Sequence, residues 1–430
     1  MQASRSPGEW QPLIDGDLAE RALRAVREIA SDVRGQVPGN LSLLNGAAGL
    51  SLFFTYMHLA FPGQGYDDDA VAYLEQAIDG AVQPEAPRSL YSGFTGVGWT
   101  IEHLKGRLLD PAAEDPGEEV AAIVLRLLDR RPWVQDFDLL SGLVGYGVYA
   151  LERWPGPEAR PCLERVVAHL GELAEPRDGG LTWLSRVELM PPGETRDLLP
   201  EGCYNLGLAH GVPAVIALLA EAHATGVGAG EPLRLLRGAV SWLLGRKLPP
   251  GSASVFPKMI DPGGRQLGKV RLAWCYGDLC IAVSLLYAAR RAGVPEWERE
   301  ALGLARAAAD RSLESSGVLD GCLCHGAAGI AHLFNRVFQA TGDPVLGEAA
   351  RLWLSRVFKM YRPGQRFGGF PHWTLLDDGE AGWLSDPGFL NGAAGVGLAL
   401  LAASLPGAPA WDRVMLAAIP PLGKEPSTSG

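Results

Sequence analysis

The chain has 430 residues, of which 47% are hydrophobic and 20% are charged, a balance typical of a globular protein with a large core and not of a disordered chain. Its formal net charge of -11 argues against nucleic acid as a partner, because binding a phosphate backbone requires a basic surface. Uncharged stretches at 35–66 and 387–411 are broken by Gly, Pro and Asn, so we expect buried helices and no transmembrane segment.

Residues 1–17 contain no apolar run before a small-residue cleavage site, so we expect no secretory signal and a cytoplasmic protein. In the cytoplasm the cysteines stay reduced, and their uneven clustering favours a metal site or catalysis over a disulfide framework. The six cysteines are Cys162, Cys203, Cys275, Cys280, Cys322 and Cys324.

Two kinds of helix are predicted to alternate along the chain. The first kind is amphipathic, with its charges on one face, and is expected at 18–33, 68–82, 118–130, 158–173, 232–244, 296–313 and 344–358. Each is followed by a Gly-x-x-Gly-like element that opens a nearly uncharged run about one helix long. The first glycines of these elements are Gly46, Gly93, Gly142, Gly211, Gly277, Gly326 and Gly392.

Uncharged helices in this number must be covered by protein on all sides. The simplest closed arrangement is an all-α fold, an α/α toroid with a double ring of seven inner and seven outer helices, and an open solenoid is the alternative. We expect one domain over residues 1–430. Long loops are expected at about 175–205, 249–273 and 362–388, each just before a glycine element, so all three should emerge at one end of the toroid.

Alignment of the repeats on their first glycine indicates a metal site. The residue two positions earlier is apolar or aromatic in five repeats but is cysteine in the fifth and sixth, as Cys275 and Cys324. His325 follows Cys324, and two thiols with one imidazole can bind zinc with a fourth tetrahedral position open, as catalytic sites require. Buried Cys and His residues without a metal are the alternative. Cys280 and Cys322 are interpreted as small core residues.

An open zinc site with two thiolate ligands suits the activation of a third thiol, because metal coordination lowers a thiol pKa from about 8.5. Activation of water is the competing use. A thiolate that adds to an electron-poor alkene forms an enolate, which a nearby acid must protonate. His210, one residue before its glycine like His325, is the candidate acid, and a hydrogen-bonded core histidine is the alternative. Asp138 and Arg271 are further charged groups near the same helix ends, either functional or members of structural ion pairs.

Three segments resemble the signature segments of the lanthionine synthetase C-like family, and the resemblance extends over essentially the whole chain. They are Trp274-Cys275-Tyr276-Gly277, Cys324-His325-Gly326 and 205–211. The resemblance implies a seven-fold α/α toroid and a lantibiotic cyclase that joins cysteine thiols to dehydroalanine or dehydrobutyrine in a precursor peptide. It also implies Zn²⁺ bound by Cys275, Cys324 and His325. Proton transfer by His210 with help from Asp138 is implied too, as is a site lined by Arg271 and Tyr276.

The sequence departs from the family pattern at Ala214 and Cys280, which replace the second glycine of the fourth and fifth repeats. Some family members also carry a small β-rich module, and 175–205 is interpreted as a reduced version of it or as a long loop. The implied partners are a dehydrated precursor peptide, with a dehydratase and other biosynthetic enzymes as further candidates.

Two other functions remain open. One is a related zinc protein that binds glutathione or a kinase-like partner without cyclising a peptide. The other is a different α/α toroid enzyme. A glycosidase is disfavoured because no second carboxylate lies in register with Asp138, whereas a zinc prenyltransferase also activates thiols and is the stronger rival.

A local excess of basic residues stands out between Arg246 and Arg271. The six are Arg246, Lys247, Lys258, Arg265, Lys269 and Arg271, against one acid, Asp261. We predict that this segment captures an acidic part of the precursor, above all its leader, and a solvated charged loop is the alternative.

Overall fold

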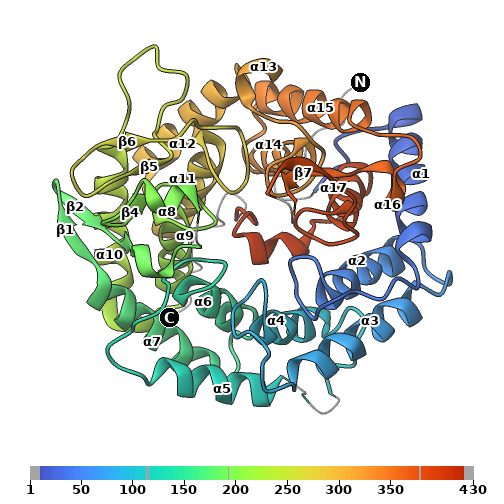
Figure 1. Cartoon of the computed structure of the whole chain (residues 1–430), viewed down its shortest axis with the longest axis horizontal. Coiled ribbons are helices and arrows are strands. Elements are labelled where there is room, and N and C mark those ends of the chain that lie inside the picture. The colour runs from blue at the N-terminus through green and yellow to red at the C-terminus, as the bar shows by residue number, and fades with distance from the viewer. Residues whose placement is uncertain (1–9, 113–114, 116, 192, 377–378, 421–430) are drawn as a thin grey trace, which may run out of the picture.

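The computed structural model describes residues 10–112, 115, 117–191, 193–376 and 379–420, and its long helices form two concentric rings (Figure 1). Each inner helix contacts the next, and the last contacts the first, so the ring is closed. The inner helices are α2 (Ala47–Ala60), α4 (Phe94–Leu104), α6 (Leu143–Glu152), α9 (Val212–Ala224), α11 (Asp278–Ala292), α14 (Ala327–Thr341) and α17 (Ala393–Ser404). The predicted double ring is confirmed, and the open solenoid is wrong.

The outer helices are α1 (Gly16–Val33), α3 (Tyr66–Ala81), α5 (Glu118–Leu128), α7 (Ala159–Leu173), α10 (Glu231–Leu244), α12 (Pro295–Ala309) and α15 (Pro344–Lys359). Each later outer helix packs on the inner helix before it, while α1 packs on α17 and so joins the two ends of the repeat array. Trp10 Nε1 and the Leu13 amide strengthen this junction by donating to the carbonyls of Ala402 and Ala403. The expected helix at 296–313 ends early, and α13 (Leu313–Ser316) is a separate turn.

Every inner helix begins directly after the first glycine of its repeat, which is the N-cap residue. The chain folds back so closely here that a Cβ on Gly211 would collide with the carbonyl of Asn205, and one on Gly277 with that of Arg271. Gly277 also has a φ of +108°, which side-chain-bearing residues rarely adopt. The glycines therefore permit a tight approach of backbone at one end of the ring.

The segments expected as long loops contain short strands. β1 (Glu175–Arg177) pairs with β2 (Gly180–Thr182), and an antiparallel sheet in the order β3-β4-β5-β6 joins the first two segments. Its strands are β3 (Leu184–Ser185), β4 (Cys203–Asn205), β5 (Met259–Ile260) and β6 (Gln266–Leu267). The third segment forms the hairpin of β7 (His372–Leu375) and β8 (Ala381–Leu384). Because 175–205 pairs with a distant segment, it is not a plain loop.

Five smaller elements complete the described chain. They are η1 (Val187–Leu189), α8 (Glu194–Asp197), η2 (Val227–Gly230), α16 (Arg366–Gly369) and η3 (Ala410–Met415). Of these, η1, α8 and α16 belong to the inserted segments. In Figure 1 the strands and α8 lie on the side of the ring that faces the viewer. The three insertions thus gather at one end of the toroid.

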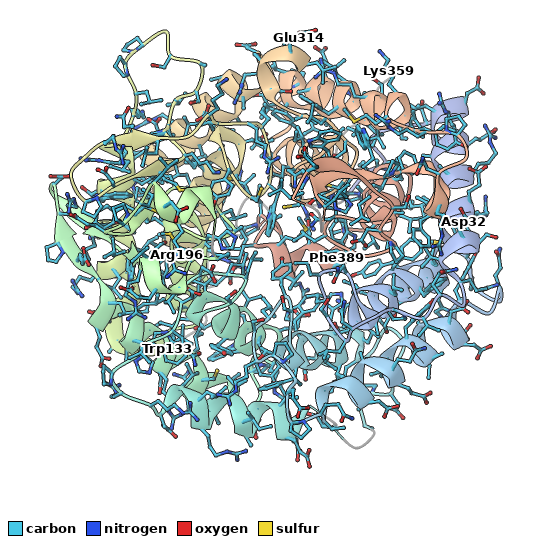
Figure 2. All side chains as sticks on the ribbon, viewed as in Figure 1. Asp32, Trp133, Arg196, Glu314, Lys359 and Phe389 are labelled. Atoms are coloured by element: carbon cyan, nitrogen blue, oxygen red, sulfur yellow. The ribbon has the colours of Figure 1, made fainter. Side chains whose placement is uncertain are left out.

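A carboxyl-terminal segment containing η3 enters the middle of the ring (Figure 1). Tyr91 Oη donates to the Val414 carbonyl at 3.0 Å, and Trp274 Nε1 donates to the Met415 carbonyl at 2.9 Å. Trp411 is buried and packs edge-to-face against Phe389, which lies toward the middle of the ring in Figure 2. The segment therefore fills the axis and supports the residue next to Cys275.

Among the described helices, none is both long enough and apolar enough to cross a membrane. Residues 1–9, which carry half of the stretch in which we looked for a secretory signal, lie outside the described residues.

Candidate active site

Among the described residues, backbone hydrogen bonds connect six of the seven neighbouring pairs of segments that precede the inner helices, and they form a belt around the ring that is interrupted between Leu140 and Ala209. In each bond the amide two residues before a repeat's first glycine donates to the carbonyl of the equivalent residue in the next repeat. The bonds run from Leu44 to Tyr91, Tyr91 to Leu140, Ala209 to Cys275, Cys275 to Cys324, Cys324 to Leu390 and Leu390 to Leu44. The belt brings equivalent positions of neighbouring repeats side by side.

Cys275 and Cys324 are direct neighbours in this belt, with the Cys275 amide 3.2 Å from the Cys324 carbonyl. Their sulfurs and an imidazole nitrogen of His325 all lie within 4.8 Å of one another. Tetrahedral zinc holds such donors about 3.5 to 3.8 Å apart, a separation that falls within this limit. A hydrogen bond from the Cys324 thiol, followed by one from His325, brings the pKa of Cys275 well below its usual value. The donor set therefore fits zinc.

Asp320, which the sequence analysis missed, lies beside His325. Its Oδ2 is 3.4 Å from His325 Nε2 and accepts the Trp373 amide at 2.9 Å, while Oδ1 accepts the Cys322 amide at 3.0 Å. Burial alone would raise the pKa of Asp320, but the neighbouring His325 and hydrogen bonds from the two amides lower it to about 2. An ionised carboxylate thus lies within ion-pair distance of the histidine of the candidate metal site, although His325 Nε2 is not aligned for a hydrogen bond.

Asp320, Cys322 and His325 form a second group whose ligand atoms lie within 4.8 Å of one another. It shares His325 with the first group, and the Cys322 sulfur accepts the His325 amide at 3.5 Å. Burial raises the pKa of Cys322, and a hydrogen bond to Cys275 raises that of Cys324, so protonation does not separate the two groups. We favour the group containing Cys275 and Cys324 because its two cysteines are neighbours in the belt and because thiolate and imidazole ligands suit zinc.

His210 and Asp138 form a tight pair, with 2.5 Å between His210 Nδ1 and Asp138 Oδ2. The Ser141 amide donates to Asp138 Oδ1 at 2.7 Å and fixes the carboxylate. The imidazole is 41% exposed, whereas Asp138 is buried. Burial disfavours the imidazolium, but the hydrogen bond and the charge of Asp138 outweigh it and raise the pKa of His210.

A cavity of about 530 Å³ adjoins this pair and is lined by His210, Asp138, Asp136 and Tyr276, with Arg196 of α8 at its edge. Figure 2 shows Arg196 over the part of the ring covered by the first insertion. Asn205 Nδ2 donates to Tyr276 Oη at 3.0 Å. Burial raises the pKa of Tyr276, so its phenol stays neutral.

Asp136 is a further acid in this cavity. Burial, followed by the negative charge of Asp138, raises the pKa of Asp136 to about 6. Asp136, Asn205 and Asp320 all lie six residues before the first glycine of their repeats, as Arg271 does. Alignment at this position would have identified all three.

Arg271 does not share the cavity with His210. It lines a second cavity of about 430 Å³ with Lys258, Lys269 and Tyr276. Tyr276 and Lys258 line both cavities, so they stand between the two. The structure thus brings Tyr276 to His210 and leaves Arg271 on the other side of it.

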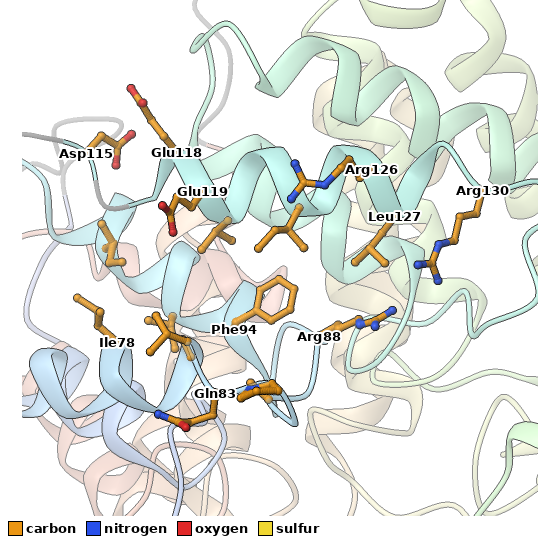
Figure 3. Close-up of a pocket in the computed structure, with 18 residues that line it drawn as sticks. Ile78, Gln83, Arg88, Phe94, Asp115, Glu118, Glu119, Arg126, Leu127 and Arg130 are labelled. Carbon is orange, nitrogen blue, oxygen red and sulfur yellow. The ribbon is translucent and has the colours of Figure 1, made fainter.

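A larger cavity, about 1230 Å³, lies far along the ring between α3 and α5, over α4 (Figure 3). Its middle is apolar and contains Phe94 and Leu127, with Arg88 and Arg130 at one end and Glu118 at the other. None of the predicted site residues lines it. We therefore assign the candidate acid groups to the smaller cavity at the belt, whereas Cys275, Cys324 and His325 line neither of the two smaller cavities.

Comparison with known proteins agrees with this geometry. The family model described as lanthionine synthetase C-like protein matches residues 37–416. The chain is 25% identical over 319 residues to the nisin biosynthesis protein NisC of Lactococcus lactis subsp. lactis, covering 70% of this chain and 75% of that protein. A solved structure of a nisin cyclase superposes with a TM-score of 0.72 at 19% identity, covering 94% of this chain and 98% of that one.

Proposed function

Because the chain belongs to the lanthionine synthetase C-like family, we propose that it is a zinc-dependent cyclase acting on a dehydrated precursor peptide. It adds cysteine thiols to dehydroalanine or dehydrobutyrine and so forms lanthionine or methyllanthionine rings. One observation carries this proposal: the belt links a Cys-Cys-His donor group to a His-Asp pair, through the hydrogen bond from the Ala209 amide to the Cys275 carbonyl. Residues 1–430 form a single domain in this proposal.

Cys275, Cys324 and His325 are the proposed metal ligands, and Asp320 holds the imidazole in place. Zinc bound by them would lower the pKa of a substrate thiol and leave a position open for its sulfur. The positive charge of Arg271 favours the Cys275 thiolate, since it contributes to the lowered pKa of that group. A site with two thiolate ligands requires a reducing compartment, so we propose that the enzyme acts in the cytoplasm.

His210 is the proposed acid. Asp138 engages Nδ1, so Nε2 is the atom that delivers a proton to the α-carbon of the enolate formed by thiol addition. Tyr276 is held by Asn205 and remains protonated, so its hydroxyl can donate a hydrogen bond to the enolate oxygen. A dehydratase that supplies the unsaturated residues is a proposed partner, together with other biosynthetic enzymes.

Incubation with a peptide that contains one cysteine and one dehydroalanine tests the function directly. We expect one free thiol to be lost per peptide while the mass stays constant, because conjugate addition is an isomerisation. Thiol titration and mass spectrometry measure both quantities, and protein stripped of metal by a chelator is the control. Persistence of the thiol with zinc-loaded protein would contradict the cyclase and favour a non-cyclising family member.

Replacement of Asp320 with alanine should lower zinc affinity about 10- to 100-fold without abolishing binding, because the carboxylate orients His325 but is not a ligand. Competition with a chromogenic chelator measures this affinity. Asp386→Ala is a matched control, since Asp386 occupies the same position of the next repeat and belongs to neither donor group. Equal affinities for the two variants would refute the role of Asp320.

A further inference from the structure

The structure divides the six basic residues of 246–271 into two sets. Three are neutralised: Arg246 pairs with Asp178 at 2.9 Å, Lys247 with Glu300 at 2.5 Å and Arg265 with Asp261 at 2.9 Å. The other three, Lys258, Lys269 and Arg271, form no ion pair within the described part of the chain. The excess of positive charge in 246–271 therefore comes from these three residues alone.

These three cations line one cavity, the 430 Å³ space beside Tyr276. Lys258 is half-buried, and its Nζ lies 4.7 Å from the centroid of the Tyr276 ring. Burial and the neighbouring guanidinium of Arg271 lower the pKa of Lys258, as expected where cations lack a counter-charge. A cavity lined by three cationic side chains, none of which is in an ion pair, favours an anion.

One acid, Glu314, also lines this cavity. It belongs to α13 at the outer rim of the ring (Figure 2). Its pKa is lowered by hydrogen bonds from its own backbone amide and from Ser312, so the carboxylate is ionised and offsets one of the three cations. The cavity thus retains a net positive charge.

The position of the cavity connects it to the reaction. Lys258 and Tyr276 line both this cavity and the one that contains His210, and Tyr276 follows Cys275 in the chain. A peptide whose cysteine reaches the donor group can therefore extend past Tyr276 into the cationic space. Residues close to the reacting cysteine would occupy it.

We propose that the cavity lined by Lys258, Lys269 and Arg271 binds a carboxylate of the substrate peptide near its reacting residues. The inference rests on the proposed function and makes the enzyme selective for an acidic residue, or a carboxyl terminus, close to the ring being formed. Arginine and lysine side chains bind carboxylates through charge-assisted hydrogen bonds, which are stronger than neutral ones. The enzyme thus recognises a carboxylate close to the reacting cysteine and not an acidic part of a distant leader.

The test measures binding without turnover. Four peptides carry the reacting cysteine and serine in place of dehydroalanine, with glutamate or glutamine beside the cysteine and a free or amidated carboxyl terminus. Zinc-loaded protein should bind the glutamate peptide about tenfold more tightly than the glutamine peptide, in keeping with a net 1.5 kcal/mol or so for a charged hydrogen bond. If the free terminus gives the preference instead, that terminus is the bound carboxylate.

Lys258→Met with Lys269→Gln should abolish this preference, and the methionine keeps the packing against Tyr276. Arg246→Gln and Lys247→Gln are matched controls from the same segment, and both should retain it. Zinc content and melting temperature establish that each variant is folded. Equal binding of all four peptides, or a preference that survives the double substitution, would overturn the proposal. Because no ring forms in this assay, its result is independent of whether the protein is a cyclase.

Discussion

On the proposed function, Cys275→Ala will abolish both zinc binding and ring formation. The substitution leaves one sulfur and one imidazole, and zinc sites in enzymes use three protein ligands. Loss of a metal that supplies several kcal/mol of stabilisation should slow thiol addition by at least about a thousandfold. Metal analysis of the purified protein and thiol titration of the peptide product measure the two effects. Retention of one zinc per chain with undiminished activity would exclude Cys275 as a ligand.

Two other cysteines provide matched controls for this experiment. Cys280 lies five residues after Cys275, in the first turn of α11, is buried and directs its sulfur to the Gly277 carbonyl at 3.1 Å. Alanine already occupies the equivalent position of the fourth repeat, at 214, so Cys280→Ala should keep both zinc and activity. Cys322→Ala separates the two candidate donor groups, because it removes a ligand from the second group alone. Loss of zinc in Cys322→Ala, but not in Cys275→Ala, would reverse the assignment.

His210→Ala will leave zinc in place and slow ring formation by about 10²- to 10⁴-fold, the usual contribution of a general acid. His210 is in neither donor group, and its Nδ1 is bound by Asp138. The variant should therefore form product much more slowly than the wild type, although it still binds the peptide. Single-turnover kinetics with metal analysis of the same sample separate the two effects. Loss of zinc from this variant would contradict the division of roles.

The pH dependence of the same step follows from the Asp138 contact. Asp138 raises the pKa of His210, so the imidazolium persists to higher pH and is lost as the pH rises through that pKa. Asp138→Asn removes this effect, and the alkaline fall in activity should move to lower pH. Asp136, whose pKa is about 6, is the other acid in the cavity, so its titration contributes to the pH dependence of the activity near pH 6. An unchanged alkaline limb in Asp138→Asn would show that another group is the acid.

The sequence alone predicted the fold closely because the relevant signals are local. A glycine at each helix start, an apolar run after it and an amphipathic helix before it are short-range patterns that repeat seven times. The same register identified Cys275 and Cys324 as equivalent positions. That these residues bind zinc stays a prediction, to which the structure adds the proximity of the donor atoms.

Contacts between distant segments were decided by the tertiary structure. Closure of the ring depends on α1 covering α17, and the strands in the insertions depend on pairing between residues such as Tyr204 and Ile260. Such contacts have no local signature, because their partners are far apart in the chain.

The polar residues of the site also depend on contacts between segments that are far apart in the chain. Alignment six residues before the glycine could have singled out Asp320, but its contacts with His325 and Trp373 are visible only in the structure. The charge of Lys258 likewise mattered only once neighbouring cations were found paired elsewhere. The periodicity of the sequence thus identified the repeats that carry the candidate site residues. Packing around the belt determined which charged side chains remain unpaired near that site. A local pattern specifies a helix and its register, whereas a functional charge is defined by the presence or absence of a partner from another part of the chain.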